Sequence, residues 1–281
     1  MELELVFSDK LIELAFLTAF VSVIGPMLYL IFYGFKRKLI FILIIAGVSA
    51  YMLFGSLFAG MVRGSVAPLS SLEIMGPVKY TIICAIITGA AEMLGLWLLY
   101  LLLKSRYSSL AVPISVGIGF ALFTAVLKFA VPAYYDMARA AAVNKYGLEY
   151  VVNAADPLRQ DAIRQEIIAL AATPASVYAW YTFDSICAII TAVCLARLMW
   201  YAFESERTAP SKWLIAFCFA ARIVLWLPGI YYSSTAVSSY TTAGAVYYAL
   251  TALLLVFTWL QARRRDQDEK VTAPPVNRRM L

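Results

Sequence analysis

The feature that most constrains this chain is a series of long apolar runs, each of about twenty residues, which is the length that crosses a bilayer as a helix. Because lipid offers backbone amides no partners, such runs must be helical, and their continuity excludes the alternating strands of a barrel. The chain is therefore predicted to be an all-α transmembrane helical bundle of about seven spans. They are expected at residues 11–33, 39–62, 79–103, 109–133, 176–203, 212–234 and 245–262.

The composition excludes several function classes. Hydrophobic residues make up 63% of the chain and charged residues 14%, too little charge for a soluble domain. Histidine is absent, so histidine bases and histidine metal ligands are excluded. The four cysteines lie in apolar runs without a CxxC pair, which predicts free thiols rather than a disulfide framework or a zinc site. No haem ligand, P-loop or nucleic-acid module is evident, so neither a cofactor nor a nucleic-acid partner is expected.

Basic residues predict the orientation. They cluster at Lys36–Lys38, at Lys104 and Arg106, at Arg207 and Lys212, and at Arg263–Arg265, always after an odd-numbered span. The positive-inside rule places these loops in the cytoplasm, and the N-terminus outside. Residues 1–265 are thus expected to form a single multi-pass domain of the cell membrane. Residues 266–281 are expected to form a polar, disordered cytoplasmic tail.

One loop, residues 134–175, is expected outside the cell in this orientation and is long enough to hold its own structure. It is predicted to contain two helices that are broken near Asn153–Asp156, with Asp156 as an N-cap and Pro157 in the first turn. The second helix carries an apolar stripe of Leu158, Ala162, Ile163, Ile167 and Leu170. This helix either packs on the bundle or lies in the membrane interface, or it forms a lid or a partner surface.

Four charged residues at membrane depth are the strongest site candidates. Each costs at least ~2.5–3.5 kcal/mol at mid-bilayer. Glu92 and Arg222 share a midplane level, while Lys128 and Asp184 share a level nearer the outside. Two buried ion pairs, Glu92–Arg222 and Lys128–Asp184, would remove most of this cost. The alternative is a polar centre that holds a substrate, a proton or an ion.

Four stretches carry the pattern of a known family. Gly89–Leu96 is similar to G-x-x-E-E-x-x-R, with Glu92 kept and Met93 at the second glutamate. Gly117–Thr124 is similar to G-x-G-H-G-x-x-E, with Phe120 at the histidine and Thr124 at the glutamate. Two further stretches match at Asp184-Ser185 with Thr191, and at Arg222–Pro228 with Trp226, where the family has E-R and a histidine, and H-x-x-x-D-F-P.

On these residues the chain resembles the YhfC family of predicted glutamic-type intramembrane proteases, relatives of the PrsW and CAAX-protease groups. The resemblance runs from about span one to span seven, and implies that Glu92 and Arg222 converge on the former active centre. Because Glu92 alone survives of the water-activating residues, it implies a catalytically inactive relative that binds or scaffolds in a complex with other membrane proteins. A divergent hydrolase that uses Glu92, alone or with Asp184, and a small-solute transporter component remain the alternatives.

Overall fold

The computed structural model describes residues 5–37, 40–104, 106, 111–204, 211–234 and 240–272, and these residues are helical throughout apart from short connections. Its elements are α1 (Asp9–Arg37), α2 (Phe41–Ala50), η1 (Tyr51–Phe58), α3 (Ala59–Val66), η2 (Leu69–Ser71), α4 (Leu72–Met75), α5 (Pro77–Leu103), α6 (Ala111–Ala125), η3 (Val126–Ala130), α7 (Val131–Tyr146), α8 (Leu148–Asn153), η4 (Pro157–Arg159), α9 (Gln160–Ala171), α10 (Ser176–Glu204), α11 (Ser211–Ser234) and α12 (Tyr240–Thr272).

Seven helical segments in the described part of the chain are long and apolar enough to cross a membrane. They cover Asp9–Phe32, Phe41–Val66, Pro77–Leu103, Ala111–Tyr146, Ser176–Phe203, Lys212–Ser234 and Thr241–Arg264. Large apolar side chains such as Phe32, Phe41 and Leu253 are exposed on the outside of the bundle, as a lipid solvent requires. The predicted all-α bundle of seven spans is therefore confirmed.

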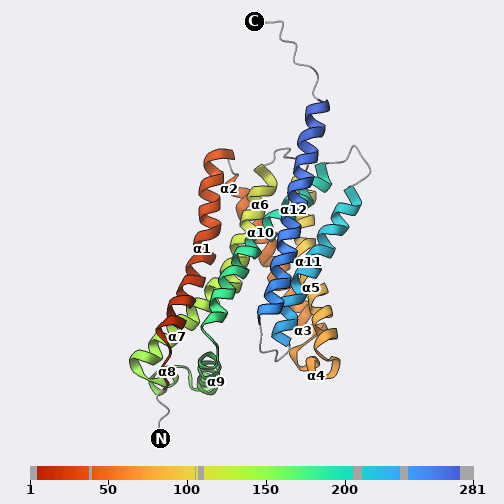
Figure 1. Cartoon of the computed structure of the whole chain (residues 1–281). Coiled ribbons are helices and arrows are strands. Elements are labelled where there is room, and N and C mark those ends of the chain that lie inside the picture. Colours follow the sequence, from red (N-terminus) through yellow and green to blue (C-terminus); the bar gives the residue numbers. More distant parts are fainter. Residues whose placement is uncertain are drawn as a thin grey trace.

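The ends of the bundle are distinct (Figure 1). Helix α1 begins at the end that carries α4, α8 and α9, and α12 ends at the opposite one. Which end faces the cytoplasm stays a prediction from the basic residues. Of those residues, Lys38 and Arg207 lie outside the described part of the chain, as do residues 235–239 and 273–281.

Most predicted span ends lie within a few residues of the observed ones, and two boundaries differ by more. The fourth span does not end at residue 133, because α6, η3 and α7 form one continuous path to Tyr146. Pro132 does not interrupt this path: it lies just after the π-helical η3, and α7 continues to Tyr146. Helix α12 also continues to Thr272, inside the segment predicted to be a disordered tail.

Glycines allow the central helices to cross at very short distances. A Cβ added at Gly119 of α6 would lie 2.0 Å from the Ile44 carbonyl oxygen of α2. One added at Gly47 of α2 would lie 2.2 Å from the Val116 carbonyl oxygen of α6. Gly117 faces Ala196 of α10 in the same way, at 3.0 Å. The glycines of span four therefore serve close packing.

The hairpin formed by α8 and α9 packs on the bundle. The Asp156 carboxylate caps the following turn by accepting a hydrogen bond from the Leu158 amide at 2.9 Å, as predicted. Ile167 and Leu170 are buried against residues of α1 and α7. Leu158, however, is 94% exposed, and its place in the predicted stripe was wrong because it precedes α9.

Candidate functional site

The Glu92 carboxylate in the middle of α5 is the centre of the site. It is completely buried, and both of its oxygens have cationic partners. Oε1 lies 3.1 Å from the Lys128 ammonium, while Oε2 accepts hydrogen bonds from the Arg222 guanidinium and, at 3.2 Å, from the Trp226 indole. Arg222 and Trp226 stand four residues apart on α11 and so face α5 together. We call Glu92, Lys128, Arg222 and Trp226 the charge cluster.

The structure brings Lys128 to a different acid from the expected one. The sequence predicted a pair with Asp184, but the Lys128 ammonium reaches Glu92 on the neighbouring α5. A long, flexible lysine stem carries its charge away from the level of its own Cα, so matched depth in the sequence is a poor guide to its partner. The Asp184 carboxylate on α10 accepts a hydrogen bond from the Tyr248 hydroxyl of α12 at 2.9 Å.

Aromatic rings surround the Lys128 ammonium. Its nitrogen lies 3.6 Å from the centroid of the Trp226 ring and 5.2 Å from that of Tyr51. The Arg222 guanidinium lies 5.5 Å from the Trp226 ring centroid. Ring faces attract cations, so they stabilise positive charge at membrane depth. Tyr51 was not a predicted site residue, since one tyrosine among eighteen carries no signal in the sequence.

Two π-helical segments border the charge cluster. Segment η1 contributes Tyr51 and Gly55, and η3 contributes Lys128. A Cβ added at Gly55 would lie 3.0 Å from Cγ of Glu92 and 2.9 Å from the Tyr51 ring, so η1 and α5 meet closely there. Such wide turns are rare and are frequent at functional sites. No residue pattern in the sequence indicated them.

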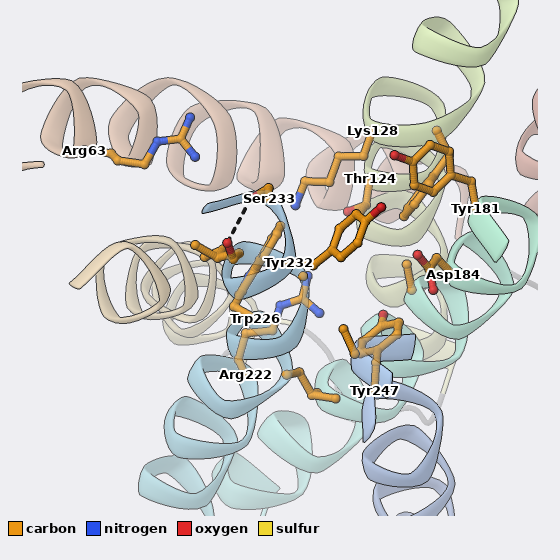
Figure 2. Close-up of a pocket in the computed structure, with 16 residues that line it drawn as sticks. Arg63, Thr124, Lys128, Tyr181, Asp184, Arg222, Trp226, Tyr232, Ser233 and Tyr247 are labelled. Carbon is orange, nitrogen blue, oxygen red and sulfur yellow. Dashed lines mark hydrogen bonds between the residues drawn. The ribbon is translucent and has the colours of Figure 1, made fainter. Parts of the chain in front are cut away.

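A pocket of about 360 Å³ lies beside the cluster (Figure 2). Arg63 and Asp184 lie on opposite sides of it, with Lys128, Arg222 and Trp226 between them. A second cavity of about 310 Å³ is lined by Tyr51, Thr88, Lys128 and Trp226 among others, and Arg63 borders both. Arg63 was also missed by the sequence analysis, because its position near the end of span two suggested no special role.

The predicted motif positions divide into two groups. Glu92, Arg222 and Trp226 meet in the cluster, and Thr191 accepts a hydrogen bond from Arg222 at 3.5 Å. Thr124 lines the pocket and donates to the carbonyl of Phe120 at 2.8 Å. Met93 and Phe120 do not join them, since their side chains pack in the apolar core, with Phe120 edge-on to Tyr51 at 4.8 Å.

The negative charge of Glu92 is buried and paired inside the bundle instead of being exposed to solvent. Glu92 has no contact with solvent, and its oxygens accept from one ammonium, one guanidinium and one indole. A carboxylate so surrounded has the partners it needs to remain ionised inside a membrane protein. The pocket in front of it is lined by three cations, Arg63, Lys128 and Arg222, and by one acid, Asp184.

Comparisons with models of protein families, with curated proteins and with solved structures find no match to this chain. Its structure is that of a polytopic membrane protein of seven apolar helices with a charged centre.

Proposed function

We propose that this chain is a non-hydrolytic membrane protein, similar in plan to an intramembrane protease, that binds ligands or partner proteins instead of cleaving them. The observation that carries this proposal is that the Glu92 side chain is buried and both of its carboxylate oxygens are paired. Glu92 is the one water-activating residue that the family resemblance retains, and it is buried with both oxygens bound to cationic or N–H donors.

Hydrolysis by Glu92 would require the carboxylate to reach a water molecule. A general base must lie within hydrogen-bonding distance of the proton that it abstracts, directly or through one water. The lone pairs of Glu92 are directed at Lys128, Arg222 and Trp226, and breaking these contacts would strand two cations in the bundle. These contacts favour a structural anion over a catalytic base.

The pocket supports a binding role. Its polar lining comes from α3, α6, η3, α10, α11 and α12, so a bound group would contact most of the bundle at once. Such convergence of a few charged and polar side chains on a partly apolar cavity is the usual form of a small-ligand site.

The test is hydrolysis of membrane-embedded peptides by the full chain in proteoliposomes. We expect no cleavage that depends on Glu92, so wild type and Glu92→Gln should give the same background. Glu73→Gln, which changes an exposed acid on α4, is the matched control. Cleavage that disappears in Glu92→Gln but persists in Glu73→Gln would contradict the proposal and favour a divergent hydrolase.

A further inference from the structure

A mostly apolar cavity adjoins the charged pocket. It has a volume of about 490 Å³ and is formed by α5, α11 and α12. Tyr232 and Ala243 line both spaces, so the two cavities share a wall. Its other lining residues are Val78, Thr81, Ile82, Leu227, Pro228, Tyr231, Thr242 and Val246. A polar chamber and an apolar chamber therefore lie next to each other.

The apolar cavity opens towards lipid. Val78, Ile82 and Val246 belong to spans of the bundle and are exposed on its outer surface. In a bilayer this surface contacts acyl chains, because backbone and side chains of a span meet hydrocarbon wherever they are not covered by protein. A hydrocarbon chain can thus enter the cavity sideways from the membrane.

The charged pocket has more positive than negative charge. The pocket is lined by three cations, Arg63, Lys128 and Arg222, and by one acid, Asp184. The Glu92 carboxylate lies beside the pocket and is already paired with Lys128 and Arg222. With both acids counted, one positive charge remains. The Lys128 side chain keeps 29% exposure to the pocket, and Arg63 is exposed, with no ion-pair partner among the described residues. An anion beside these two groups would balance the charge at membrane depth.

We propose that the two cavities together bind one membrane lipid with an anionic headgroup, its phosphate facing Arg63 and Lys128 and an acyl chain lying in the apolar cavity. This inference rests on the proposed binding function and names the ligand class for it. A lipid fits better than a soluble anion because the apolar cavity lies directly beside the charged pocket and opens to the bilayer.

The probe is phosphatidylglycerol, added to the purified full chain and counted by native mass spectrometry against phosphatidylcholine. Wild type should retain phosphatidylglycerol more tightly than phosphatidylcholine. Arg63→Gln should weaken its binding about tenfold, which is the effect of losing one charge-assisted contact. Arg159→Gln, an exposed arginine outside the pocket, should leave binding unchanged.

A second pair of variants tests the apolar cavity without changing charge. Ala243→Phe places a ring in the wall that both cavities share and should weaken phosphatidylglycerol binding by a similar factor. Ala245→Phe, two residues further on the exposed side of α12, is the matched control and should have no effect. This pair decides the question even if Arg63→Gln fails to fold.

Three results would overturn the inference. The first is equal retention of phosphatidylglycerol and phosphatidylcholine. The second is binding of glycerol 3-phosphate as tight as that of the lipid, which would make the site one for a soluble anion. The third is a peptide in place of lipid in the mass spectrum. Failure here is separate from failure of the proposed function, which only Glu92-dependent cleavage would contradict.

Discussion

Two glutamate–arginine pairs in this molecule have the same chemistry and opposite surroundings. Glu92 and Arg222 lie inside the bundle with side-chain exposures of 0% and 4%. Glu149 and Arg164 join α8 to α9 with exposures of 51% and 36%. The exposed pair is bidentate, with N–O distances of 2.5 and 2.7 Å, yet water solvates either partner when it breaks. Water does not solvate the partners of the buried pair in this way. Lys128 and Trp226 supply the additional donors to the Glu92 carboxylate. Hydrogen-bond geometry alone therefore does not predict which pair contributes more to stability, whereas burial does.

The largest effect should come from Glu92→Gln. The substitution leaves Arg222 and Lys128 facing a neutral amide inside the bundle, at a cost of about 3–5 kcal/mol. We expect a large fall in the unfolding temperature in detergent, followed with a thiol-reactive dye that labels buried Cys84 and Cys218 once the fold opens. Glu149→Gln is the matched control. An unfolding temperature equal to that of wild type would mean that Glu92 is not paired.

The next largest effect should come from a change in helix packing that leaves all charges in place. In Gly119→Ala the new methyl group would overlap the Ile44 carbonyl, and the helices must separate, which typically costs about 1–3 kcal/mol. Gly64→Ala is the control, since a Cβ there meets no atom within 4 Å. The same dye assay should rank Gly119→Ala well below Gly64→Ala. Equal stability would show that α2 and α6 are not in such close contact.

A smaller effect is expected at the turn between α7 and α8, where a glycine is needed for its backbone conformation and not for close packing. Gly147 has φ of +84°, and a Cβ added to it would meet no atom within 4 Å. Gly147→Ala should therefore cost about 1 kcal/mol through backbone strain alone. Gly147→Asn should lose about as much, because with ψ of 158° the residue lies outside the left-handed helical region that asparagine tolerates. Stability equal to wild type in Gly147→Ala would show that strain at this position is not a cost.

The smallest effect should come from Glu149→Gln at the exposed pair. Hydrogen bonds from the Arg164 guanidinium lower the pKa of Glu149 below its usual value. The stabilisation is thus present above the ordinary carboxyl pKa of about 4.3 and is lost as the pH falls through the lowered pKa. The difference in unfolding temperature between wild type and Glu149→Gln should be slight at pH 7 and vanish in acid. A difference that grows on acidification would contradict this sign.

Most of the fold could be predicted from the sequence, but only part of the site could. Seven apolar runs specify seven spans because the bilayer fixes their length. Glu92 and Arg222 could be matched because both stand near the midplane of their spans. The partner of Lys128 could not be found, because a flexible side chain on a π-helical turn does not point where a regular helix would send it. Tyr51 and Arg63 join the site through helix packing, which spacing along one chain does not reveal.

The wide turn of η1 determines how this bundle would respond to insertions and deletions. A π-turn holds one residue more than an α-turn, so the second span contains surplus length next to Glu92. Deleting one residue there would let the span relax to a regular α-helix while the residues beyond it, Arg63 included, kept their direction. A deletion in a regular α-helical part of the span would instead turn everything beyond it by about 100° and move Arg63 away from the pocket. The wide turn thus lets this span lose a residue without losing the direction of Arg63.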